Sequence, residues 1–153
     1  SEEDSVHLLE WFDDWEEVGG LSISNADWEQ VLQIRSEVNK HIEEARNKEI
    51  IGSSLDAKIE LYCKEETKVL LEKFSDELRF VFITSEASVE EFQEKGDETN
   101  LEDMRIAVSK TIFQKCVRCW HSRPEVGSIQ GHESICNRCL ENIEGDGEIR
   151  NFA

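Results

Sequence analysis

The sequence predicts an α+β fold in which a long helix is followed by a small sheet with a packed helix, and then by a cysteine module. Three observations predict this fold. Apolar residues recur at helical spacing over residues 28–45, β-forming runs follow, and four of the five cysteines fall in two C-x2-C pairs near the end of the 153-residue chain. We therefore divide the chain into an acidic helical and α+β part, residues 1–104, and a strand with the cysteine module, residues 105–153.

The long helix is predicted from an apolar stripe and its capping signals. Ser24-x-x-Asp27 forms a capping box at its start, and Gly52 follows its end. The stripe consists of Trp28, Val31, Leu32, Arg35, Val38, Ile42 and Ala45. Before this helix, residues 1–20 mix acids with apolar and aromatic residues. We expect them to form an extended or partly helical lead-in that lays aromatic side chains on a neighbouring surface.

The sheet and its helix are predicted from the middle of the chain. Ser53-x-x-Asp56 predicts a short helical turn, and residues 59–63 alternate like a half-buried strand. Residues 66–77 return to helical spacing. Residues 78–83 (LRFVFI) form a dense β-forming run, and residues 105–113 predict a further strand. The expected order is helix, strand, helix, strand, strand and cysteine module.

The charge of the chain is uneven. With 35 Asp and Glu against 17 Lys and Arg, the formal net charge is −18, which argues against a uniformly basic nucleic-acid surface and against polybasic attraction to membranes. Residues 1–104 carry −19, residues 105–139 carry +4 and residues 140–153 carry −3. No apolar run is long enough to cross a membrane, and the acidic first residues are unlike a leader. Because the chain begins at Ser1, we expect a processed chain or a piece of a longer one.

The spacing of the four paired cysteines predicts one structural Zn²⁺ in a zinc-ribbon-like module. Cys116 and Cys119 form the first pair, and Cys136 and Cys139 the second, with sixteen residues between the pairs. Two such knuckles can aim four thiolates at one tetrahedral centre, which leaves no open position for catalysis. The alternative is a pair of redox C-x-x-C motifs, but nothing around them resembles a thioredoxin-like unit.

We expect structural roles for two histidines near the paired cysteines and for the fifth cysteine. His121 and His132 could replace a cysteine as ligands, but with four cysteines in register we expect both to be hydrogen-bonding or surface residues. The fifth cysteine, Cys63, lies in an apolar stretch, and we expect it to be a small buried hydrophobic residue.

The positive segment is the best candidate for a binding surface, because the chain lacks the phosphate-loop, nucleophile-elbow and zinc-protease motifs. Arg118 lies between the first two zinc ligands and Trp120 follows the second. A guanidinium and an indole on a rigid knuckle suit a single-stranded base. Two alternatives remain open. Trp120 could pack the module onto the sheet, and Arg118 could bond to backbone carbonyls or to acids of residues 1–104.

Two groups of residues resemble the C-terminal region of bacterial isoleucyl-tRNA synthetases. The first group surrounds and follows the cysteines: Lys115–His121 (KCVRCWH), Val126-Gly127, His132, Ile135–Cys139 (ICNRC), Asn142-Ile143, Gly145–Glu148 (GDGE), Arg150 and Phe152-Ala153. The second group lies upstream: Ser5–Leu8 (SVHL), Arg35-x-x-Val38-Asn39-Lys40, Glu43-x-Ala45-Arg46 and Ile51–Ala57 (IGSSLDA). The matches follow the family's order along essentially the whole chain.

The resemblance implies a class I ligase that attaches isoleucine to tRNA(Ile) with ATP and hydrolyses mischarged valine in a separate domain. The HIGH and KMSKS signatures are absent, so these residues by themselves are expected to be non-catalytic. By position, Cys116, Cys119, Cys136 and Cys139 become the zinc ligands, and Arg118 and Trp120 become the pair that faces the anticodon. The implied partners are the tRNA(Ile) anticodon arm and the rest of the synthetase, in the cytoplasm, without membrane or DNA. Lys40, Arg46 and Lys48 are weaker candidates for contact.

Two further readings share the cysteine spacing. Formamidopyrimidine-type DNA glycosylases end in a zinc hairpin that enters DNA, but they use an N-terminal proline, and the sole proline here is Pro124. The other reading is an acidic zinc-ribbon adaptor that binds proteins. A glycosylase would cleave damaged duplex DNA and an adaptor would ignore tRNA, whereas a synthetase region should bind tRNA weakly and charge nothing.

Overall fold

The computed structural model describes residues 23–152, so the predicted lead-in over residues 1–20 lies outside the described residues. The long helix α1 spans Asn25–Asn47, and Ser24 and Asp27 form the predicted capping box at its start. Its buried stripe is Val31, Ile34, Val38, His41, Ile42 and Ala45. The predicted helix is confirmed, with one correction to its stripe: Leu32 is 54% exposed, and Ile34 takes the buried position.

A four-stranded mixed sheet follows α1. The 3-10 turn η2 (Ser54–Asp56) leads into β1 (Ala57–Cys63), which pairs in parallel with β2 (Glu86–Glu91) and antiparallel with β4 (Met104–Lys110). The short β3 (Asp97–Glu98) extends the order to β2-β1-β4-β3. The predicted turn and the strands predicted at 59–63 and 105–113 are therefore confirmed, with β4 ending earlier than expected.

The strand predicted at residues 78–83 is wrong. These residues form the short helix α3 (Leu78–Phe82), which ends at Ile83 in a left-handed conformation. Before it, α2 (Glu65–Glu72) and the turn η3 (Ser75–Glu77) confirm the helical spacing predicted over 66–77. The second strand is instead β2, with the sequence EASVEE. A parallel pair needs a crossover between its strands, and α2, η3 and α3 together provide the one between β1 and β2.

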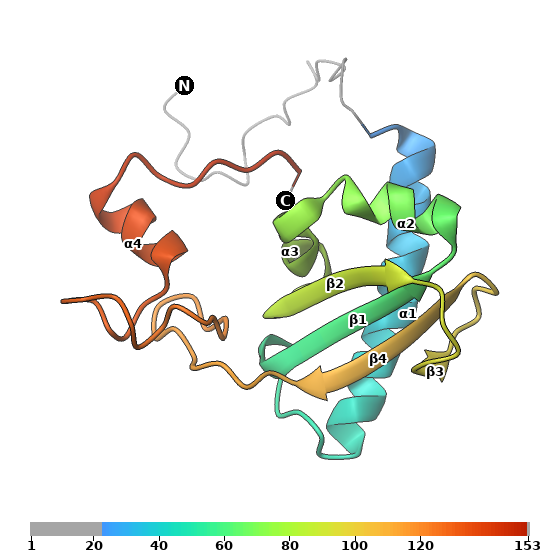
Figure 1. Cartoon of the computed structure of the whole chain (residues 1–153), viewed down its shortest axis with the longest axis horizontal. Helices are drawn as coiled ribbons and strands as arrows, with labels where there is room; N and C mark the ends of the chain where they lie inside the picture. The colour runs from blue at the N-terminus through green and yellow to red at the C-terminus, as the bar shows by residue number, and fades with distance from the viewer. Residues whose placement is uncertain (1–22, 153) are drawn as a thin grey trace, which may run out of the picture.

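The core lies between the helices and one face of the sheet. On β1, Ala57, Ile59, Leu61 and Cys63 are at most 1% exposed and form one cluster with residues of α1, α2, α3 and β4. Figure 1 shows α1 passing behind the sheet and α2 and α3 along its upper edge. Cys63 is thus the buried hydrophobic residue predicted, and burial raises the pKa of its thiol to about 12.

The cysteine module follows β4 and lies beside the sheet (Figure 1). It ends in α4 (Asn137–Glu144), after which the chain turns back toward α3. Because β4 begins at Met104 and sits between β1 and β3, the sheet continues across the boundary that we placed at residue 104. The division into residues 1–104 and 105–153 stays a prediction. Among residues 23–152, no helix is long and apolar enough to cross a membrane.

Ile83 gives a test of the helical assignment of residues 78–82. A β-branched residue at φ 57 is strained, and its side chain is 49% exposed, so little packing depends on it. We expect Ile83→Gly to be more stable than Ile83→Ala by about 1 kcal/mol, because glycine alone reaches this conformation without strain. The free energies of unfolding are measured by urea denaturation.

The matched control is Val69, which is also 49% exposed but lies inside α2. There the order should reverse, with Val69→Ala more stable than Val69→Gly by about 1 kcal/mol. An alanine advantage at both positions would contradict the left-handed end of α3.

Candidate metal centre and nucleic-acid interface

The four paired cysteines converge on one point. Their sulfur atoms all lie within 4.8 Å of one another, and two distances join the two pairs: 3.7 Å from Cys116 to Cys139 and 3.7 Å from Cys119 to Cys136. A tetrahedral zinc with Zn–S bonds of about 2.3 Å places its sulfurs about 3.8 Å apart. The sulfur geometry therefore fits a single zinc ion.

Local hydrogen bonds explain why the chain folds into these knuckles. In the first, Trp120 N–H donates to Cys116 C=O at 2.9 Å, and Cys116 N–H donates to His121 C=O at 2.9 Å. In the second, Cys136 is the N-cap of α4 and its carbonyl accepts from Leu140 N–H at 3.0 Å. Opening a helix is also a property of redox motifs, but convergence of all four sulfurs is a property of a metal site.

The protonation of the cluster follows from burial and backbone donors. Burial alone would raise the pKa of Cys116, but backbone N–H groups of Cys119, Cys136 and Arg118 outweigh it and lower the pKa to about 6. Burial raises the pKa of Cys136 to about 12. A divalent cation among these sulfurs would favour the thiolate form of all four, as metal ligation does for cysteine.

Each knuckle carries an arginine that reaches the opposite pair. Burial raises the pKa of Cys139, and a hydrogen bond from Arg118 opposes that shift. Burial lowers the pKa of Arg138, but a hydrogen bond to Cys119 helps to raise it overall. Two guanidiniums therefore lie where they offset the charge of −2 that zinc and four thiolates would carry. This arrangement was not predicted from the sequence, although the repeated C-x-R-C spacing was its signal.

Trp120 does not pack the module onto the sheet. Its side chain is 62% exposed, its backbone is left-handed at φ 66, and Lys115 Nζ lies 5.9 Å from the centre of its ring. The next residue takes the packing role instead. His121 is 9% exposed and meets Phe80 of α3 edge-on, with ring centres 5.7 Å apart. The packing role that was left open for Trp120 is therefore taken by His121, which packs on α3.

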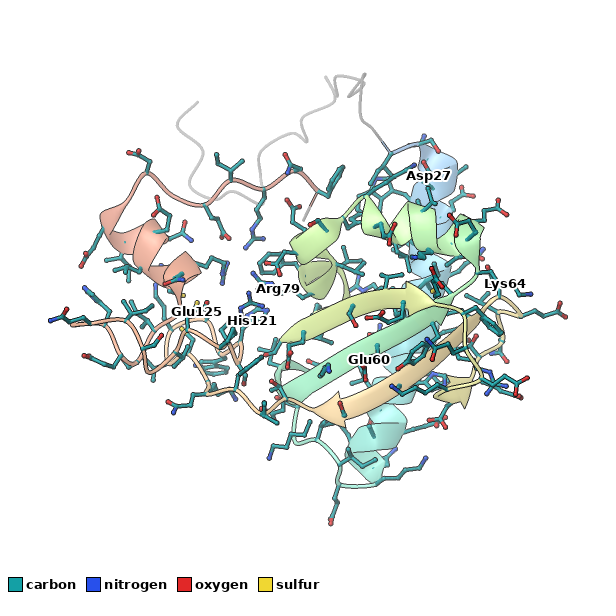
Figure 2. The ribbon with its side chains drawn as sticks, viewed as in Figure 1. Asp27, Glu60, Lys64, Arg79, His121 and Glu125 are labelled. Atoms are coloured by element: carbon teal, nitrogen blue, oxygen red, sulfur yellow. The ribbon has the colours of Figure 1, made fainter. Side chains whose placement is uncertain are left out.

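The two histidines lie outside the sulfur cluster, as expected, but His121 is not the hydrogen-bonding or surface residue predicted: it is buried, and among the described residues neither ring nitrogen has a hydrogen-bond partner. His121 points into the space between the module and α3, close to Arg79 (Figure 2). Burial and the charges of Arg79 and Arg138 lower its pKa to about 4, so it is neutral at pH 7. His132 Nε2 lies 3.1 Å from a carboxylate oxygen of Glu144 at the surface.

Comparison with known proteins gives two kinds of match. Residues 113–142 match the family model described as the zinc finger found in FPG and IleRS. Over 99% of its length the chain is 41% identical to the isoleucine–tRNA ligase of Acinetobacter baylyi. Over 97% it is 43% and 45% identical to those of Vibrio cholerae and Shewanella sp. strain ANA-3.

This chain is similar to isoleucine–tRNA ligases from end to end. It spans 16% of the length of these relatives. The zinc finger is common to both names in its family description, but the similarity to the ligases extends through α1 and the sheet. Together, the zinc-finger match and the four converging sulfurs indicate one structural Zn²⁺.

The metal centre predicts a pattern of thiol reactivity. We expect one zinc per chain by elemental analysis and no rapid reaction of the zinc-loaded protein with a thiol reagent at pH 8. Chelation should release four reactive thiols. Cys63 should react only after a denaturant is added, because it is 1% exposed within the main apolar core.

Two variants provide matched controls. Cys63→Ala should keep one zinc per chain, whereas Cys136→Ala should lose it. Five thiols reacting before chelation, or zinc retained by the Cys136 variant, would contradict the four-cysteine site.

Proposed function

We propose that this chain is the C-terminal tRNA-binding region of an isoleucyl-tRNA synthetase and that its zinc module contacts the anticodon arm of tRNA(Ile). In this proposal, Cys116, Cys119, Cys136 and Cys139 hold the zinc, and Trp120 and Arg118 face the anticodon. The observation that carries it is the exposed indole of Trp120, held on a rigid knuckle in a chain similar throughout to isoleucine–tRNA ligases.

The conformation of Trp120 supports a role outside packing. A non-glycine residue in a left-handed conformation costs of order 1–3 kcal/mol, and such strain is concentrated at functional sites. An aromatic ring that stacks on a base contributes about 1–3 kcal/mol. The knuckle holds the indole outward before any ligand binds, so stacking would need little further ordering of the chain.

Arg118 has two roles in this proposal. Its side chain is exposed and opposes the rise that burial causes in the pKa of Cys139, so we infer that it stabilises the metal centre from the surface. A guanidinium has five N–H donors, and a contact with one sulfur leaves others for a phosphate or a base edge. Loss of Arg118 should therefore affect both zinc retention and RNA affinity.

The charge distribution supports a narrow contact. The tetrahedral centre would reduce the +4 of residues 105–139 to +2, and the rest of the chain is acidic. Only a few phosphates can then be neutralised, so the dependence of affinity on salt should be shallow. For two or three phosphates, the slope of log K against log salt is about −1.4 to −2 for a single strand.

The activity belongs to the whole enzyme in this proposal. The full-length protein would join isoleucine to tRNA(Ile) with ATP in the cytoplasm, using catalytic and editing sites outside these residues. The 16% span of the relatives and the absence of HIGH and KMSKS from the sequence support this division. The remainder of the synthetase would then be the chain's permanent partner.

The first test changes Trp120. In the full-length enzyme, Trp120→Ala should weaken binding of tRNA(Ile) about 10-fold, because the loss of one stacked base is of order 1–3 kcal/mol. Trp120→Phe should retain most of the affinity. Affinity is measured by filter binding or anisotropy with the anticodon stem-loop, and zinc content should remain one per chain. Equal affinity of Trp120→Ala and the parent would reject the contact.

The second test separates the two roles of Arg118. We expect Arg118→Lys to keep zinc but to bind tRNA more weakly, because an ammonium retains the charge but not the planar set of donors. Arg118→Ala should also lose zinc faster to a chelator. If Arg118→Ala released zinc at the same rate as the parent, a role of Arg118 in stabilising the metal centre would be rejected. If it bound tRNA as tightly as the parent, the RNA contact would be rejected.

A further inference from the structure

We propose that Glu148, Arg150, Asn151 and Phe152 form a clasp that positions the zinc module for tRNA binding. The inference rests on the function proposed above and adds positioning residues to it. The clasp follows α4, crosses back to the α+β body and ends beside α3 (Figure 1).

The end of the clasp is anchored to the body by one carboxylate. Glu77 accepts hydrogen bonds from the backbone N–H groups of Asn151 at 2.6 Å and Phe152 at 2.7 Å. The ring of Phe152 lies 5.2 Å from that of Phe74, which in turn lies 5.3 Å from Trp28 of α1. Phe152 therefore joins the edge of the main core, at a site remote in sequence from the module.

The middle of the clasp meets the module at Phe80. The guanidinium carbons of Arg150 and Arg79 each lie 4.1 Å from the centre of this ring. Both guanidiniums therefore contact this one ring. Arg138 of α4 lies 5.2 Å from the same centre, and His121 of the first knuckle meets its edge. One aromatic ring of the body thus touches the clasp, α4 and a knuckle.

A shared carboxylate connects the clasp to α4. Glu148 accepts from Arg138 at 2.8 Å and from Arg150 at 2.9 Å. Arg138 directly precedes Cys139, one of the four clustered cysteines. The chain of contacts therefore runs from the metal centre through α4 and the clasp to the core of the body.

A second junction joins the module to Ser85, where Arg123 donates to Ser85 C=O at 3.4 Å and also pairs with Asp76 at 3.8 Å. There Ser122 N–H donates to Ser85 Oγ at 2.6 Å, and Ser85 Oγ donates to Leu55 C=O at 2.5 Å. Between α3, α4 and the clasp lies a cavity of about 550 Å³, whose lining includes side chains of both charge signs. The module is therefore attached at separate points rather than through a continuous core. Releasing the clasp leaves the module held where Ser122 and Arg123 meet Ser85 and Asp76, and a pivot there would move Trp120.

The test uses the full-length synthetase and three readouts: zinc content, isoleucine activation without tRNA, and the KM for tRNA(Ile) in aminoacylation. We expect Phe152→Ala to raise the KM for tRNA about 10-fold, with one zinc per chain and unchanged activation. Phe152→Leu should restore most of the affinity, because it refills the contact with Phe74. The matched control is Ile149→Ala, since Ile149 lies between clasp residues but is 90% exposed.

A double variant shows whether the clasp acts through Trp120. If it does, Phe152→Ala combined with Trp120→Ala should weaken tRNA binding little more than Trp120→Ala alone. If the double variant instead weakened tRNA binding by the product of the two single effects, the positioning role would be overturned. Loss of zinc or of isoleucine activation in Phe152→Ala would also overturn it. An unchanged KM in Phe152→Ala, beside a raised KM in Trp120→Ala, would reject the clasp and leave the proposed function standing. An unchanged KM in Trp120→Ala would reject the proposed anticodon contact itself.

Discussion

The convergence of four sulfur atoms is the constraint on which the module depends. Its buried apolar cluster contains only Cys116, Val126, Cys136 and Cys139, with Cys119 and Ile135 packed against them, so three of the four truly buried members are themselves cysteines. So small a cluster cannot offset the conformational entropy of about thirty residues. Binding of a structural zinc supplies about 10–16 kcal/mol in small zinc domains, and this free energy is folding free energy. The same geometry directs Trp120 outward and His121 inward, so the exposed surface and the packing surface both derive from one turn.

The body and the module are stabilised by different kinds of interaction. The body has a continuous apolar core beneath one face of its sheet, whereas its contact with the module is made of arginines, carboxylates and one aromatic ring. Arg123 and Arg79 pair with Asp76, and Arg138 and Arg150 with Glu148. Part of the acidity that looked unfavourable for nucleic-acid binding therefore lies against the positive segment. These pairs leave Arg118 and Trp120 at the exposed surface of the first knuckle, where RNA contact is proposed.

The sequence was most informative where a local pattern and its structural cause coincide. The stripe and capping box of α1, the alternation of β1 and the cysteine spacing each describe a single element or site, and each is found in the structure. The run at residues 78–83 was misleading because a run of six residues, four of them β-branched or aromatic, suits a short buried helix as well as a strand. Leu78, Val81 and Phe82 are buried at helical spacing, while β2 was hidden among acids with only Ala87 and Val89 facing the core. The parallel pairing of β1 and β2 decides which of these two segments is the strand, and no local sequence pattern records that pairing.

By itself, the sequence determined the fold class, the four-cysteine site and the resemblance to the isoleucyl-tRNA synthetases, because these depend on residue type and spacing along the chain. Only the tertiary structure decided that Trp120 is exposed and that His121 packs on Phe80, since neighbouring residues of one turn can point in opposite directions. It also decided how the module is attached. Phe152 and Glu77 are 75 residues apart, and the contact between them exists only because α3 and the segment after α4 meet in space.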